Sequence, residues 1–115
     1  MSAKQNNTSF PYRDNKLAGI RRAGNIHSYA VIKDIMGSQM IDSLPLRIRC
    51  ECSILDCQEI VGLSLSRRRE LRQKYPKGFI VILSHAYSPP NTKVYESQEF
   101  SVVERLEFNK AVVDI

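Results

Sequence analysis

Apolar side chains recur every three or four residues along the segment HSYAVIKDIMGSQMIDSL and predict a helix over about residues 28–43. Ser28 suits the N-cap, because its hydroxyl can accept a hydrogen bond from an N–H group of the first turn. Pro45 follows the segment and disfavours its continuation as a helix. The expected apolar stripe consists of Tyr29, Ile32, Met36 and Met40, with Ile35 beside them.

The preceding residues 1–24 are polar and are interrupted by Pro11 and Gly24, a composition that is typical of loops. We therefore expect a flexible N-terminal tail over residues 1–24 and a folded domain over residues 25–115. A basic tail that contacts an acidic partner is the alternative.

Apolar and polar residues alternate along LRIRCEC, which predicts a half-buried strand. One face carries Leu46, Ile48, Cys50 and Cys52. The opposite face carries Arg47, Arg49 and Glu51. The next residues, SILDC, break the alternation and indicate a turn, and EIVGLSL then predicts a short second strand over about residues 59–63.

The segment SLSRRRELRQKY predicts a second helix, with Ser64 as its N-cap and with Pro76 and Gly78 at its end. Its apolar stripe consists of Leu71 and Tyr75 alone, so we expect this helix to lie on the surface.

Three further strands are expected after this helix. GFIVILSH is the most apolar of them, and one of its faces carries Phe79, Val81, Leu83 and His85. KVYESQ and EFSVVERL predict a hairpin. Together the elements predict an α+β fold with a small antiparallel sheet, one N-terminal helix and one basic surface helix.

A hydrophobic fraction of 43% in 115 residues fits one globular domain. No apolar run approaches the ~20 residues of a membrane-spanning helix, and the polar start of the chain lacks the apolar core of a secretory signal. We therefore expect a cytoplasmic protein with no membrane partner. Thiols stay reduced in that compartment, where clustered cysteines more often bind metal or do chemistry than form disulfides.

The three cysteines of the chain all lie between Cys50 and Cys57. Cys50 and Cys52 point to the same side of the predicted strand, and a turn near Asp56 returns Cys57 to them. His85 lies on the core-facing side of its own strand and can complete a tetrahedral zinc site. We predict that these three cysteines and His85 bind Zn²⁺, and that the bound metal stabilises the turn. The alternatives are three free structural cysteines, and a His85 that is hydrogen-bonded or exposed.

Four protein ligands close the coordination shell, whereas a catalytic zinc keeps one position open for water. We therefore expect a structural metal and no enzymatic activity. Glu51 or Glu59 could act as the general base of a zinc hydrolase only if one ligand were missing. The sequence contains no glycine-rich phosphate loop and no nucleophile elbow.

Residues 48–105 resemble a family of small, largely uncharacterised bacterial domains. The shared features are an apolar-x-Cys-Glu-Cys strand, a nearby third cysteine, an arginine-rich helix, a YPxGFIV segment and a histidine soon after it. The resemblance implies that the three cysteines and His85 occupy the metal positions of the family. This chain departs from the family at Ser84, where glycine is usual, and at Ala86, where an acidic residue is common. Some members stand beside signalling or sensor modules, which implies a regulatory role by analogy.

The second helix also gathers positive charge in a chain whose formal net charge is +5. Only Glu70 opposes its basic residues, which are Arg67, Arg68, Arg69, Arg72, Lys74 and Lys77. Arginines on one flank could contact phosphates, although no aromatic residues alternate with them for base stacking, and a solvated face is the alternative. We therefore expect a non-enzymatic binding or regulatory module with an unknown protein partner. A nucleic-acid-binding protein that uses helix 64–77 is the alternative.

Overall fold

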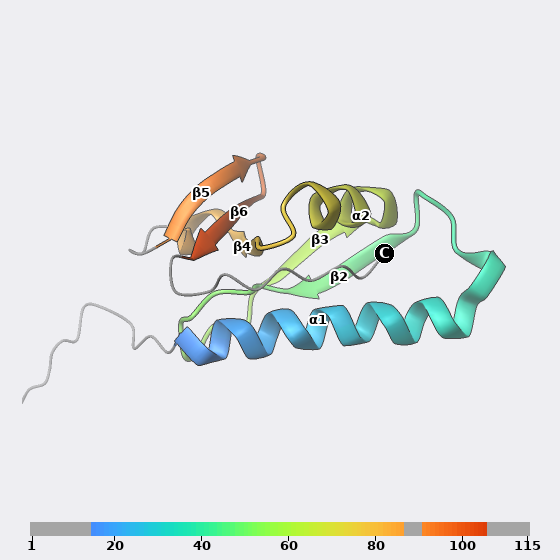
Figure 1. The fold of residues 1–115 in the computed structure, drawn as a ribbon, viewed down its shortest axis with the longest axis horizontal. Helices are drawn as coiled ribbons and strands as arrows, with labels where there is room; N and C mark the ends of the chain where they lie inside the picture. Colours follow the sequence, from blue (N-terminus) through green and yellow to red (C-terminus); the bar gives the residue numbers. More distant parts are fainter. Residues whose placement is uncertain (1–14, 87–90, 106–115) are drawn as a thin grey trace, which may run out of the picture.

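The computed structural model describes residues 15–86 and 91–105, which form an α+β fold as predicted (Figure 1). In chain order the elements are α1 (Asn15–Met36), η1 (Gly37–Gln39), β2 (Pro45–Arg49), β3 (Ile60–Ser64), α2 (Leu65–Lys74), β4 (Phe79–Ile82), η2 (Leu83–His85), β5 (Asn91–Glu96) and β6 (Phe100–Arg105). Neither α-helix in this part of the chain combines the length and the apolar character that a membrane crossing needs.

The strands divide into two antiparallel sheets, where the sequence predicted one. β2 pairs with β3, while β6 lies between β4 and β5 and forms the predicted hairpin with β5. The backbone after β2 joins the sheets. The Cys50 N–H donates to the Glu59 carbonyl (3.0 Å), and the next N–H, of Glu51, donates to the Ile80 carbonyl (2.8 Å). The chain therefore passes from one sheet to the other within the Cys-Glu-Cys sequence.

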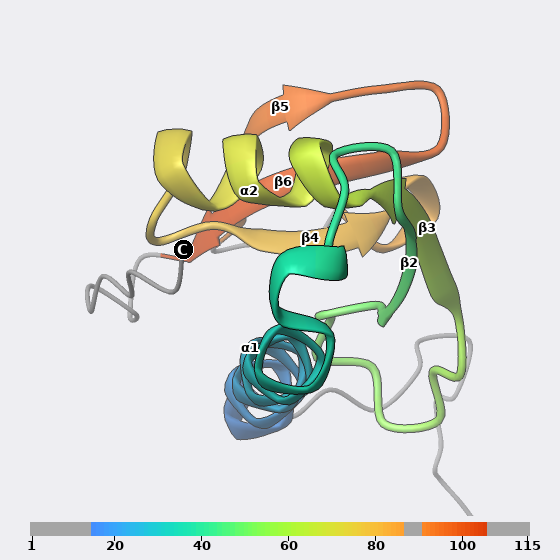
Figure 2. The same ribbon diagram turned by 90° about the vertical axis from the view of Figure 1, so that its right-hand side faces the viewer.

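Helix α2 packs on one face of the three-stranded sheet, and residues of β4 and β6 on the other face pack against the start of α1 and the cysteine loop (Figures 1 and 2). The α2 side contains Leu71, Ile80, Phe100 and Val102, with Ile48 and Val61 of the smaller sheet. The α1 side contains Ala18, Phe79, Val81, Val103 and the three cysteines. The cysteines thus belong to the core between α1 and the sheet.

Helix α1 begins at Asn15, so the prediction of a flexible tail was wrong for residues 15–24. Residues 1–14 of the predicted tail lie outside the described residues. Gly24 suggested a loop, because glycine is unfavourable inside a helix. Buried polar side chains offset this preference by fixing the helix to the rest of the protein. These side chains are Arg21, Arg22 and Asn25.

The helix predicted over residues 28–43 ends earlier, at Met36. The next residue, Gly37, has a positive φ of 51°, a conformation that glycine adopts at little cost and that ends the α-helix. Tyr29 is buried as predicted, whereas Ile35 is 77% exposed. The buried stripe therefore passes through Ile32, which packs against the core, and not through Ile35.

Candidate metal centre

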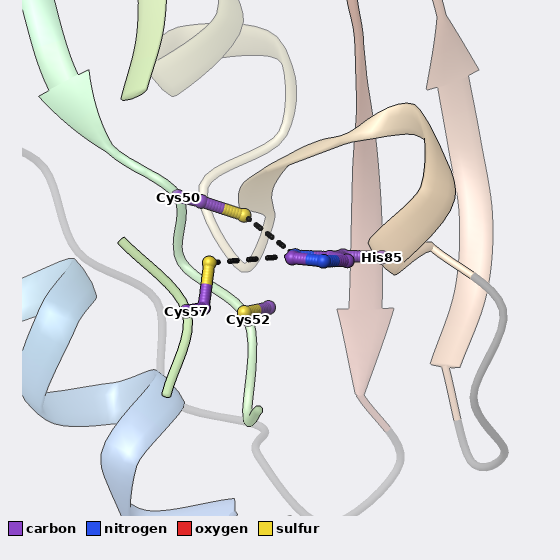
Figure 3. A group of neighbouring side chains, drawn as sticks. All are labelled: Cys50, Cys52, Cys57 and His85. Atoms are coloured by element: carbon purple, nitrogen blue, oxygen red, sulfur yellow. Dashed lines mark hydrogen bonds between the residues drawn. The ribbon is translucent and has the colours of Figure 1, made fainter. Parts of the chain in front are cut away.

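The ligand atoms of Cys50, Cys52, Cys57 and His85 all lie within 4.8 Å of one another (Figure 3). The Nδ1 atom of His85 is 3.5 Å from the Cys50 sulfur and 3.4 Å from the Cys57 sulfur. A tetrahedral zinc ion with sulfur and nitrogen ligands separates its ligand atoms by about 3.5–3.8 Å. The structure thus brings the four predicted ligands together at close to the spacing that zinc requires.

Cys50 and Cys52 were predicted on a strand but lie on irregular backbone. β2 ends at Arg49, yet Cys50 and Cys52 still direct their sulfurs to one place. The Cys57 N–H donates to the Ile54 carbonyl (3.3 Å). This bond closes the predicted turn and returns the third thiol to the first two.

His85 reaches the cysteines from a turn, because the strand predicted over GFIVILSH ends at Ile82 and residues 83–85 form η2. Phe79 and Val81 pack with the cysteines, as their predicted face requires. Strand alternation, however, does not continue to the histidine. The 3₁₀ turn instead directs the imidazole of His85 toward the cysteine sulfurs (Figure 3). The parity argument for His85 was therefore incorrect, although the residue it selected lies in the cluster.

N–H groups donate to cysteine sulfurs in this cluster. The backbone N–H of Ile82 is bonded to the Cys50 sulfur with a nitrogen-to-sulfur distance of 3.3 Å. The Nη1 atom of Arg21 is 3.5 Å from the Cys52 sulfur. Donors around a sulfur stabilise the thiolate, which is the form of cysteine that binds metal.

The three thiols also affect one another's ionisation. Cys50 and Cys52 share a hydrogen bond between their side chains. This bond raises the pKa of Cys50 and lowers the pKa of Cys52 to about 4. Burial raises the pKa of Cys57. The protein alone therefore favours one thiolate beside two neutral thiols. A divalent cation is the kind of ligand that would hold all three as thiolates.

Glu51, between the first two cysteines, was predicted on an exposed strand face but is 1% exposed. It turns inward because the chain leaves β3 at this point and pairs with β4. Its carboxylate accepts hydrogen bonds from Arg72 (2.5 Å), Asn25 (2.7 Å) and the Ile80 N–H (2.9 Å). The residue between two candidate ligands thus anchors them to α1, α2 and β4.

The arginines predicted to contact polyanions divide between core and surface. Arg68 and Arg72 are buried, so the prediction of a solvent-facing basic flank was wrong for both. Arg72 is drawn inward by the Glu51 carboxylate, and the Arg68 guanidinium lies 3.6 Å from the centre of the Tyr29 ring. Arginine suits such positions, because its planar head group pairs with carboxylates and stacks on aromatic rings.

The other two arginines of this set lie at the surface of α2. Arg67 pairs with Glu70 (3.0 Å), and Arg69 pairs with Asp42 (3.4 Å). Ser64 caps the helix as predicted, since its hydroxyl accepts a hydrogen bond from the Arg67 N–H. The helix is therefore less basic at its surface than its sequence indicates.

The polar face of α1 was not predicted from the sequence. Three side chains of this face donate to backbone carbonyls: Arg21 to the loop between the cysteines, Arg22 to Gly78 just before β4, and Asn25 to Arg49 at the end of β2. A signal was present: the stripe at Tyr29, continued toward the N-terminus with the helical period, reaches these residues and then Ala18. Their polarity marked them as surface residues instead.

No family model, no curated protein and no solved structure matches this chain. The resemblance to the bacterial domain family therefore stays a prediction. The geometry of the four ligands and the contacts that surround them are the features that point to a function.

Proposed function

We propose that this protein is a non-enzymatic zinc-binding module in which Cys50, Cys52, Cys57 and His85 hold one structural Zn²⁺. One observation carries the proposal: the four ligand atoms lie within 4.8 Å of one another. Three thiolates and one imidazole form a ligand set that structural zinc uses. Magnesium and calcium prefer oxygen ligands, so the thiolates favour zinc over both.

The metal would join parts of the chain that are distant in sequence. The cysteines follow β2, whereas His85 follows β4 and lies 28 residues beyond Cys57. Binding to ligands that come together only in the folded protein adds folding free energy. This contribution matters in a small domain, which can bury only a limited apolar core.

The ligand set favours a structural over a catalytic metal, because four protein ligands leave no position for water. Of the two candidate general bases, Glu51 is engaged by Arg72 and Asn25 in the core, and Glu59 is exposed. A zinc hydrolase is the alternative only if water replaces His85.

We propose that the module acts in the cytoplasm by binding another protein, in a regulatory role. The nucleic-acid alternative has lost support, because Arg68 and Arg72 lie in the core. We therefore expect the native protein to bind duplex DNA and RNA no more tightly than about 10⁻⁴ M at physiological salt, the weak end of non-specific affinity. Submicromolar binding that weakens steeply with added salt would favour the nucleic-acid alternative.

Metal content and cobalt spectroscopy test the zinc site. Protein purified without chelator should contain one zinc per chain by elemental analysis. Cobalt in place of zinc should give the visible absorption of a tetrahedral ion and a thiolate-to-cobalt charge-transfer band. His85→Ala should weaken metal binding. His27→Ala is the matched control, because His27 is exposed on α1 and lies outside the cluster.

Two results would contradict this proposal. The first is a metal content near zero together with three freely titratable thiols. The second is unchanged cobalt binding in the His85→Ala variant, which would indicate a water molecule in the fourth position and would support the hydrolase alternative.

A further inference from the structure

Arg21 of α1 holds the loop between the second and third cysteines through hydrogen bonds. Its side chain is buried, with 4% of the residue exposed. Its Nη1 atom donates to the carbonyls of Cys52 (3.0 Å) and Ile54 (2.7 Å). Its Nη2 atom donates to the carbonyls of Leu55 (3.1 Å) and Cys57 (3.4 Å). One side chain thus spans the loop from one candidate ligand to the next.

The charge of Arg21 has no carboxylate partner within residues 15–86 and 91–105. Arg72 is different, because it is buried together with the Glu51 carboxylate. A buried cation that contacts only neutral carbonyls is costly. The Cys52 sulfur, 3.5 Å from Nη1 of Arg21, is the group beside it that can supply negative charge.

The proposed metal site has a matching excess of negative charge. Three thiolates carry one more negative charge than Zn²⁺ can balance, and a neutral imidazole adds none. The sulfurs lie in the core, where such an excess is expensive unless a cation lies close by. A buried arginine that meets no carboxylate in the described part of the chain and a buried anionic site therefore fit one another.

We propose that Arg21 is the positioning residue of the zinc site: it balances the excess negative charge and holds the loop from Cys52 to Cys57 in its ligating shape. This inference rests on the proposed function. Arginine suits both tasks, because its planar fork can reach several carbonyls while its charge faces a sulfur. Helix α1, which contributes no ligand, thereby determines how tightly the metal is held.

Arg21→Gln is the direct test. Its zinc dissociation constant is measured by competition with a chelator of known affinity, and its cobalt spectrum is recorded in parallel. We expect zinc affinity to fall about 10- to 100-fold, as is typical when an outer-shell partner of a metal ligand is lost. The thiolate-to-cobalt band should move to longer wavelength, because the Cys52 sulfur loses a donor. Destabilisation of the fold alone would not move that band.

Arg22→Gln is the matched control. Arg22 is also buried on α1, but it donates to the carbonyls of Gly78 (2.8 Å) and Pro76 (2.5 Å), which precede β4. Its variant should keep the native zinc affinity and cobalt band. Arg21→Lys keeps the charge but loses the fork, so we expect a smaller loss of affinity. If Arg21→Gln does not fold, the zinc affinity and cobalt band of Arg21→Lys test the role of Arg21 instead.

Unchanged zinc affinity and an unchanged cobalt band in folded Arg21→Gln would overturn this inference and leave the zinc site intact. Equal effects of Arg21→Gln and Arg22→Gln would also overturn it. If only Arg21→Lys folds, native zinc affinity and a native cobalt band in that variant would also overturn the proposed role of Arg21. A native protein that takes up neither zinc nor cobalt would instead overturn the proposed function.

Discussion

Arg72 and Glu51 form an ion pair inside the protein, with 2.5 Å between Nη2 and Oε2 and with side chains that are 3% and 0% exposed. Glu51 stands between two candidate metal ligands and Arg72 belongs to α2, so the pair connects the cysteine sequence to the second helix. Burying two charges costs desolvation energy. Further hydrogen bonds to the carboxylate from Asn25 and the Ile80 N–H offset part of that cost.

Glu51→Gln should lower the free energy of unfolding by about 3–5 kcal/mol, because it leaves the charge of Arg72 uncompensated in the core. Urea denaturation of the metal-loaded protein measures the effect. Glu70→Gln is the control, since it breaks the exposed pair with Arg67 and should cost at most about 1 kcal/mol. A loss at Glu51 no larger than the loss at Glu70 would argue against a buried ion pair.

Arg68→Gln should destabilise the protein by about 2 kcal/mol or more, because it removes a desolvated cation from the face of the Tyr29 ring. Arg69→Gln should have a smaller effect, since Arg69 is partly exposed, its partner Asp42 is exposed, and it contacts Tyr29 only through a hydrogen bond. Thermal denaturation gives the melting temperatures of the two variants for comparison. Equal melting temperatures would argue against a stabilising contact between Arg68 and the Tyr29 ring.

Cys52→Ser should lower stability by several kcal/mol, because zinc binding contributes folding free energy and the variant loses one thiolate ligand. A strong chelator should lower the melting temperature of the native protein toward that of the variant. The same chelator should leave the variant almost unchanged. A native protein that melts at one temperature with and without chelator would show that no metal supports the fold.

Gly24→Ala should stabilise the protein by about 0.5–1 kcal/mol, because alanine is favoured over glycine inside a helix and a Cβ atom there meets nothing within 4 Å. Gly37→Ala also has open space, but the φ of Gly37 is +51° and should make alanine destabilising. Chemical denaturation of both variants measures the two changes in the free energy of unfolding. An equal gain at the two positions would be inconsistent with the different backbone conformations.

The features that could be predicted from the sequence have local causes. Ser64 caps α2 because its hydroxyl reaches an N–H group in the same turn. The hairpin of β5 and β6 follows from two alternating segments separated by a short turn. Three thiols that are close in sequence meet when a tight turn lies between them, so the cysteine part of the site could also be predicted.

The features that were missed depend on partners far along the chain. Helix α1 starts early because Arg21 and Arg22 bond to carbonyls beyond residue 50. Glu51 lies inside because Arg72 supplies the opposite charge. Polar residues that satisfy one another in a core cannot be distinguished from surface residues by their type.

The uneven spacing of the four ligands has a consequence for the order of folding. Cys50, Cys52 and Cys57 can gather a metal ion by closing a very short loop, which costs an unfolded chain little entropy. His85 follows 28 residues after Cys57 and can join them only once β4 has arrived. Rapid mixing of the unfolded chain with cobalt should therefore show thiolate ligation first and tetrahedral ligand-field absorption later. Metal captured in this way would act as a nucleus onto which the second sheet assembles.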